Sequence, residues 1–133
     1  MSYLLEDIIQ FLADADACEG AAKDAFWDKL PDAPDECIAL FEYTSEGERP
    51  WDKETMHRSV QIIFRAQTAA KAKAKATQVY NLINDSLDEA GRIDYNGRFS
   101  QTTLRQTPFK VDEDEKARVV YGFNMGITTS IDT

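Results

Sequence analysis

Apolar positions recur along the chain with two different spacings, which predict helices in two places and strands elsewhere. Over residues 3–14 they fall at i, i+3, i+4 and i+7, the spacing of one helix face, at Leu5, Ile8, Ile9 and Leu12. A second helix is predicted over residues 69–87, with these positions buried: Ala72, Ala76, Val79, Tyr80, Ile83 and Leu87.

Four further segments have the composition and alternation of strands. Residues 37–43 are apolar on both faces at their start, which favours a central place in a sheet. Residues 58–67 and 118–129 alternate apolar and polar side chains, as half-buried strands do. Residues 99–111 form the fourth predicted strand, which Pro108 would interrupt.

Two smaller features complete the pattern. Residues 25–27 fit either a short strand or an anchoring turn. The even-numbered face of the segment 118–129 carries Gly122 and Gly126, and glycines in a strand let a bulky group approach the backbone. We therefore expect something large to lie against this face.

The predicted order of elements is helix, strand, strand, helix, strand, strand. This order favours an α+β fold with a mostly antiparallel sheet of about four strands and two main helices packed on one face. A length of 133 residues fits a single domain over residues 1–133.

The formal net charge of −9 is unevenly distributed along the chain. Residues 1–48 hold 13 acids and 2 bases, a net of −11, whereas residues 49–133 hold 11 acids and 13 bases, a net of +2. DNA binding by phosphate neutralisation needs clustered Lys and Arg, so it is not expected here. The acidity either only keeps the protein soluble, or forms a surface that repels DNA or meets a basic partner.

Sequence features that would place the chain in a membrane or in an export pathway are not found. It has no run of about 18 apolar residues, so no membrane span is expected. Its start lacks the basic flank and cleavage site of a signal peptide. Cys18 and Cys37 are therefore expected to be free, reduced thiols.

No catalytic site, cofactor or metal is expected. His57 is the single histidine and has no cysteine at ligand spacing. Cys37 begins an apolar strand, which would bury it and make it inert. The acidic run 112–115 lacks the glycine and the ligand spacing of a calcium-binding loop, so we interpret it as a charged hairpin tip.

Three groups of residues are candidate contacts with other proteins or subunits. Trp51, with Arg49 and Lys53 beside it, lies in a polar loop over residues 44–57 and either anchors an interface or folds onto its own core. Three lysines oppose the dipole at the start of the second helix, so they either meet acids, including those of a neighbouring subunit, or form a solvated face: Lys71, Lys73 and Lys75. The third group is the acidic tip, Asp112, Glu113, Asp114 and Glu115.

Two segments together resemble a known family. The first runs from Leu30-Pro31-Asp32-Ala33-Pro34 into the apolar strand Cys37-Ile38-Ala39-Leu40-Phe41. The second is Val60-Gln61-Ile62-Ile63-Phe64-Arg65, followed by the Ala-rich helix that ends in Tyr80-Asn81-Leu82-Ile83. This arrangement, over nearly the whole chain, is similar to the tail-terminator or minor capsid proteins of long-tailed bacteriophages. In those proteins the strand reads roughly VQIRVR. The loop 44–57 departs from that pattern, since it has only Gly47 where relatives often have a more glycine-rich turn.

The resemblance implies a virion structural protein, made in the host cytoplasm and built into the head–tail junction without enzymatic activity. It implies a homo-oligomeric ring, commonly a hexamer, that caps the tail tube, ends its polymerisation and meets a head-completion or connector protein. DNA would pass through the ring without specific binding. Two alternatives stay open: another head–tail joining or minor capsid subunit, and a small cytosolic α+β module that binds a ligand.

Overall fold

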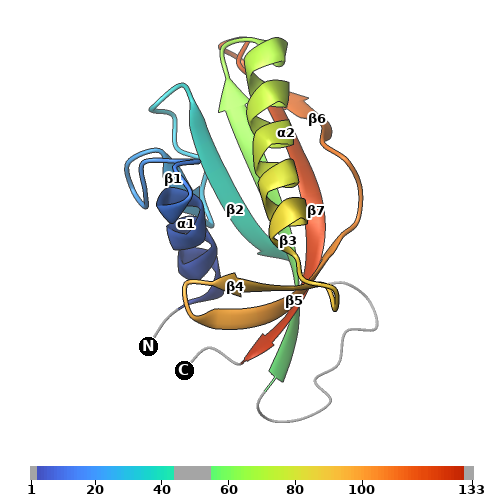
Figure 1. Ribbon diagram of the computed structural model, residues 1–133. Coiled ribbons are helices and arrows are strands. Elements are labelled where there is room, and N and C mark those ends of the chain that lie inside the picture. The colour runs from blue at the N-terminus through green and yellow to red at the C-terminus, as the bar shows by residue number, and fades with distance from the viewer. Residues whose placement is uncertain (1–2, 44–54, 131–133) are drawn as a thin grey trace.

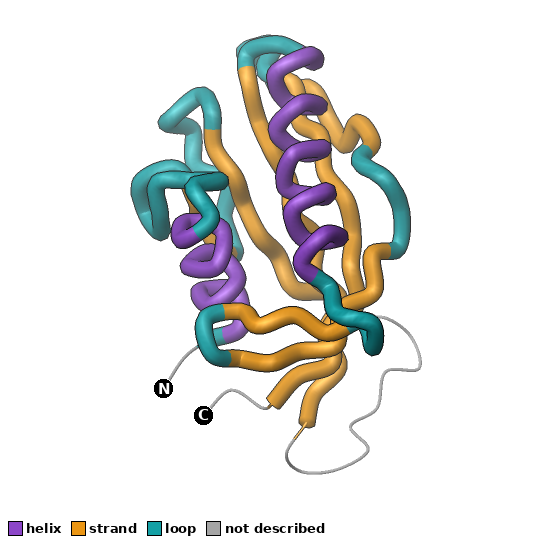
Figure 2. Tube along the Cα trace, in the orientation of Figure 1, coloured by secondary structure: helices purple, strands orange, loops and turns teal. Residues whose placement is uncertain are grey.

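The computed structural model describes residues 3–43 and 55–130. Within them the chain forms two helices and seven strands (Figures 1 and 2). In chain order these are α1 Leu4–Asp14, β1 Ala25–Trp27, β2 Cys37–Tyr43, β3 Thr55–Ala66, α2 Ala69–Ser86, β4 Arg92–Tyr95, β5 Arg98–Leu104, β6 Phe109–Glu113 and β7 Val119–Ser130.

One mixed sheet contains all of these strands in the order β1-β2-β3-β7-β5-β4, with β6 also paired to β7. The β1–β2 pair is parallel and the other pairs are antiparallel. On one side β7 pairs with β3 from Val119 to Ser130. Its other side is divided between β6, which pairs with residues 119–122, and β5, which pairs with residues 125–128. The sheet is curled into a half-barrel, with the β4–β5 hairpin crossing below the two helices (Figure 1).

The prediction of a mostly antiparallel sheet of about four strands, in the order α-β-β-α-β-β, is wrong. Residues 99–111 form two strands rather than one, because the chain leaves β7 after Leu104 and returns to it at Phe109. The four-residue strand β4 was missed because it is too short to show a clear alternation. The parallel strand β1 adds a seventh strand at the edge.

The concave side of the curled sheet holds the main core. Apolar faces of α1 and α2 pack there against alternate residues of β2, β3 and β7, such as Leu40, Ile62 and Phe123. In this core an ion pair joins α1 to the β4–β5 hairpin: Asp7 accepts a 2.8 Å hydrogen bond from Arg98, and both side chains are buried. On the convex side, Ala39, Ile63 and Val120 form a second, small apolar cluster, which Leu30 and Phe41 partly cover.

The strand-to-helix connection expected at residues 60–87 is confirmed. β3 ends at Ala66, and Thr68 caps α2 by accepting a hydrogen bond from the backbone N–H of Lys71 at 3.2 Å. Four of the predicted positions are buried in α2: Ala72, Ala76, Val79 and Ile83. The other two, Tyr80 and Leu87, are partly buried against the same core.

Candidate functional site

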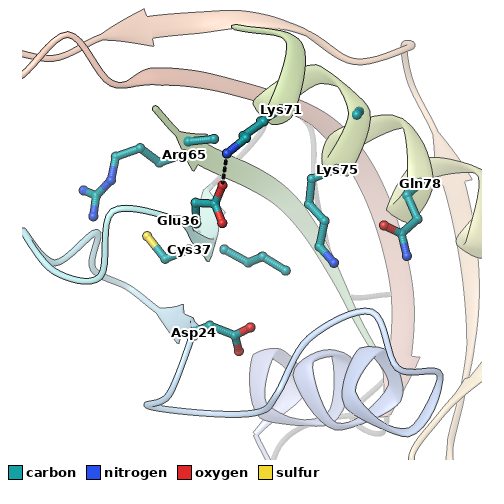
Figure 3. Close-up of a pocket in the computed structure, with 10 residues that line it drawn as sticks. Asp24, Glu36, Cys37, Arg65, Lys71, Lys75 and Gln78 are labelled. Carbon is teal, nitrogen blue, oxygen red and sulfur yellow. Dashed lines mark ion pairs between the residues drawn. The ribbon is translucent and has the colours of Figure 1, made fainter. Parts of the chain in front are cut away.

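A groove separates the first half of α2 from the acidic loops that precede β2. Its central hollow, of about 400 Å³, has an apolar floor that includes Ile38 and Ala66. Lys71 and Lys75 extend from α2 on one side, and Asp24 and Glu36 stand opposite (Figure 3). Two further hollows adjoin it and share some of these residues, so the groove runs beside the first half of α2.

The three lysines of α2 have different surroundings. Lys71 reaches across the groove to Glu36 of its own chain at 3.7 Å, in a pair that is mostly exposed (Figure 3). Lys75 is half-buried and lines the groove, while Lys73 is exposed. Lys71 therefore has an acid within its own chain, and an exposed pair of this kind contributes only about 0.2–1 kcal/mol.

Both cysteines line this boundary and are free thiols. Burial, aided by nearby Asp24, raises the pKa of Cys18 to about 11. Burial also raises the pKa of Cys37. Because the thiolate is the nucleophile, these shifts keep both groups in the unreactive form at neutral pH.

Two buried arginines hold the proline-rich loop that borders the groove. Arg65, at the end of β3, donates to the backbone oxygens of Pro34 at 2.6 Å and Asp35 at 3.1 Å. Arg118, just before β7, bonds three carboxylates, those of Asp114 at 2.7 Å, Asp32 at 2.9 Å and Asp35 at 3.1 Å. We call these contacts of Arg65 and Arg118 the arginine clamp.

The clamp neutralises part of the acidic N-terminal third. Hydrogen bonds from Lys116 and Arg118 hold the pKa of Asp32 below its usual 3.8. Burial opposes the same shift at Asp114, but hydrogen bonds from Arg118 outweigh it and lower that pKa too. These acids are bound within the chain, so they add little to any acidic outer surface.

The predicted acidic tip is only partly a tip. Asp112 and Glu113 pair with β7 as the last residues of β6, and Asp114 belongs to the clamp. Glu113 also lies 3.8 Å from Lys110. Glu115 alone of the four lies in the turn as an exposed acid with no bonding partner recorded in the described residues.

A second polar surface lies on the convex side, where Arg105 rests on β7. A Cβ added to Gly126 would lie 2.8 Å from the Nη2 atom of Arg105, so the glycine makes room for the guanidinium. Arg105 also donates to the hydroxyl of Tyr43 at 3.4 Å. The prediction that a bulky group approaches the glycine face of this strand is thereby confirmed at Gly126.

Aromatic residues extend this convex surface. Phe99 of β5 is 57% exposed, the largest exposure among the large apolar side chains described. The guanidinium of Arg92 stacks over its ring at 4.9 Å. Tyr43, at the end of β2, is 37% exposed. Aromatic residues and arginine are the types most enriched in protein interfaces, so we name Tyr43, Arg92, Phe99 and Arg105 the convex patch.

Several other sequence predictions can now be placed. Trp51, Arg49 and Lys53 lie outside the described residues. His57 bonds the hydroxyl of Thr128 through Nδ1 at 2.7 Å. Across residues 3–43 and 55–130, no group of three His, Cys, Asp or Glu side chains could hold a metal ion, and no helix is long and apolar enough to cross a membrane.

The clamp and the convex patch were not predicted from the sequence. Arg118 lies 83 residues from Asp35 and 86 from Asp32, and no local pattern reveals a contact of that separation. Only Gly126 gave a signal for Arg105, because it indicated that something large lies nearby without indicating what.

Comparisons with known proteins agree with this architecture. The sequence model of a family described as bacteriophage tail terminator protein matches residues 11–131. Eleven chains of solved structure have a similar fold. One of them aligns over 98% of this chain and 92% of its own with a TM-score of 0.54 and 10% identity, a likeness that concerns the fold alone. No curated protein matches the sequence.

Proposed function

The chain belongs to the bacteriophage tail terminator family, and from this premise we propose that it forms a ring on the end of the phage tail tube. In this proposal the ring stops addition of tube subunits and presents its outer surface to a head-completion or connector protein. The observation that carries the proposal is the family match, which covers residues 11–131 and so includes nearly every element of the fold.

The two surfaces of the fold support an assembling role. On the convex side of the half-barrel, opposite the helices, the convex patch offers exposed aromatic and arginine side chains. The hollow of about 400 Å³ beside α2 is lined in part by two groups that pair with each other, Lys71 and Glu36. Such a lining favours an assembly component over the ligand-binding alternative.

We further propose that DNA passes through this ring without specific binding. A net charge of −9 repels phosphates, and an acidic inner wall would let DNA slide. Because Asp32 and Asp35 are bound to Arg118, the repelling charge would come from other acids of the first third, such as Glu6, Asp16 and Glu19.

Tail assembly with and without the protein tests the proposal. Tails assembled without it should grow beyond their normal length or fail to join heads, and adding the purified protein should restore both properties. Cryo-electron microscopy of the restored tails should show a closed ring of this fold at the head-proximal end. Tails of normal length that join heads without the protein would contradict the terminator role.

Replacing Lys71, Lys73 and Lys75 together by Glu tests whether the start of α2 contributes to contacts between subunits. If these lysines meet acids of a neighbouring subunit, the variant should assemble less well, and the defect should be larger at low salt than at high salt. Lys71→Glu alone is the matched control, because it breaks the contact with Glu36 inside the chain. Equal effects of the single and triple changes would remove Lys73 and Lys75 from the interface.

A further inference from the structure

We infer that the groove beside α2 receives residues 111–115, the end of β6 and the start of the turn after it, from a second copy of the chain. We call residues 111–115 the acidic segment. This inference rests on the proposed ring and assigns one contact between its subunits to particular residues. Three observations carry it: the charge at the centre of the groove, the side chains that the acidic segment exposes, and the contacts that hold this segment in shape.

The centre of the groove is basic, although the net charge of the chain is −9. Three bases and two acids line the central hollow, whereas acids outnumber bases in each of the two adjoining hollows. Both acids of the central hollow are already engaged. Glu36 lies 3.7 Å from Lys71. The Asp24 carboxylate accepts hydrogen bonds from the backbone N–H groups of Glu19 and Gly20. The central hollow therefore favours an occupant that brings its own negative charge.

Lys75 is the base of this hollow that would meet the occupant. It is half-buried and extends from α2 into the groove (Figure 3). No carboxylate of residues 3–43 or 55–130 forms an ion pair with it. The floor beside it is apolar and includes Ile38 and Ala66. A matching occupant therefore combines an acid with an apolar side chain.

The acidic segment exposes both kinds of side chain. The register of β6 on β7 shifts between Lys110 and Asp112, so Val111 lies at a bulge and has no partner on β7. A bulge turns a side chain out of the regular alternation, and Val111 is 38% exposed. Glu113 and Glu115 are exposed as well, and within the described parts of the chain Glu115 forms no ion pair. In the proposed contact Val111 lies on the apolar floor and Glu115 meets Lys75.

The arginine clamp holds the acidic segment in shape before a partner arrives. The Asp114 carboxylate accepts hydrogen bonds from the backbone N–H groups of Lys116 and Arg118, both at 3.0 Å, and from Nε of Arg118 at 2.7 Å. Nζ of Lys116 lies 2.6 Å from Asp32. Glu115 is thus presented by a turn that is already ordered, and a preorganised segment loses less conformational entropy on binding.

The groove and the acidic segment are different surfaces, so one copy can offer each of them to a different neighbour. Such a heterologous contact repeats into a closed ring or an open filament. Val119, at the start of β7, pairs with Ala66 just before α2, so the turn after β6 and the start of α2 lie at the same end of the sheet (Figure 1). The contact would form at this end and leave the β4–β5 hairpin, at the other end, outside it.

Charge reversal and its repair test the inference. Lys75→Glu should weaken self-assembly about tenfold or more, and Glu115→Lys should do the same, because each places like charges across the contact. Combining both changes in one chain should restore assembly toward the wild-type value. Lys73→Glu is the matched control, since it makes the same change on the same helix at an exposed lysine that does not line the groove.

Light scattering of the purified proteins measures the assembly, and circular dichroism confirms that each variant folds. If the free wild type stays monomeric, ring density on added tail tubes is measured instead by cryo-electron microscopy. Three results would overturn this contact and leave the proposed function standing: unaffected single variants, no repair in the double variant, or an equal loss in Lys73→Glu. A wild-type protein that forms no ring in either setting would overturn the proposed function as well.

Discussion

Arg118 and Arg105 both lie beside β7, but the chain surrounds them in opposite ways. The side chain of Arg118 is 7% exposed and bonds three carboxylates, each from the same chain. Arg105 is exposed and rests over Gly126, where it meets the hydroxyl of Tyr43. Arg118 thus joins segments that are far apart in sequence from a buried position, whereas Arg105 makes its contacts at the surface.

The difference shows how the same residue type can support folding in one place and binding in another. A buried arginine has lost its water, so its charge depends on acidic partners within the chain, and removing them destabilises the fold. An exposed arginine keeps much of its water, so removing its partner changes the stability of the subunit little. Measurements of unfolding free energy should therefore separate buried arginine contacts from exposed ones.

The largest effect is expected at the third arginine of the buried class, Arg98. Asp7→Ala removes the buried carboxylate that lies 2.8 Å from Arg98 and also accepts a hydrogen bond from Asn96. Loss of one partner of a buried pair lowers the free energy of unfolding by about 3–5 kcal/mol. Chemical denaturation of the isolated protein measures this loss. A change below about 1 kcal/mol would place this pair with the exposed class.

Gly122→Ala is expected to have the next largest effect, because the neighbours of Gly122 cannot move away. An added Cβ would lie 2.6 Å from the backbone oxygen of Ile62 and 2.9 Å from the side chain of Ile63. Overpacking of this kind destabilises by about 1–3 kcal/mol. Thermal unfolding should show a clear decrease in Tm. An unchanged Tm would mean that β3 and β7 can move apart to admit the methyl group without loss of stability.

The arginine clamp should make stability depend on acidity. Hydrogen bonds lower the pKa of Asp32 and Asp114 below 3.8, so between the folded and unfolded pKa values the unfolded chain binds more protons. The clamp therefore stabilises fully above the unfolded pKa, and this stabilisation is lost as the pH falls through the folded pKa.

Asp32→Asn tests this dependence, because it removes one of the titrating groups. The variant should lose less stability than the wild type when the pH is lowered from about 5 to about 2, and the difference in Tm should be smaller than that of Gly122→Ala. Asp28→Asn serves as the control, since Asp28 is an exposed acid outside the clamp. Parallel curves for the wild type and Asp32→Asn would show that the clamp does not titrate in this range.

Segments with a long and regular pattern could be predicted from the sequence, and short segments could not. The helices, β2, β3 and β7 were found because each extends over seven or more residues with consistent alternation or helical spacing. β4 has four residues and β6 has five, and both depend on a neighbouring strand for their pairing. The curl of the sheet depends on the same pairing, so it could not be predicted from the sequence.

Among the site residues too, those with a local sequence signal could be predicted, and those defined by contacts between distant segments could not. Gly126 was recognised as a place of close approach because a glycine in a strand has a local meaning. Its partner Arg105 could not be identified, since the two residues lie on different strands or loops and meet only in the folded chain. For Lys71 the sequence left open an acidic partner or a solvated face, and only the fold shows that Glu36 of the same chain lies 3.7 Å away.

Gly126→Ala should have the smallest effect on stability and is the most direct test of the comparison. The added Cβ would meet the end of the Arg105 side chain, which can swing away, whereas at Gly122 it would meet backbone. The free energy of unfolding should therefore change by no more than about 0.5 kcal/mol in either direction. Chemical denaturation of Gly126→Ala beside Gly122→Ala measures the difference. A loss at Gly126 as large as that at Gly122 would show that the Arg105 side chain cannot move away from the added methyl group.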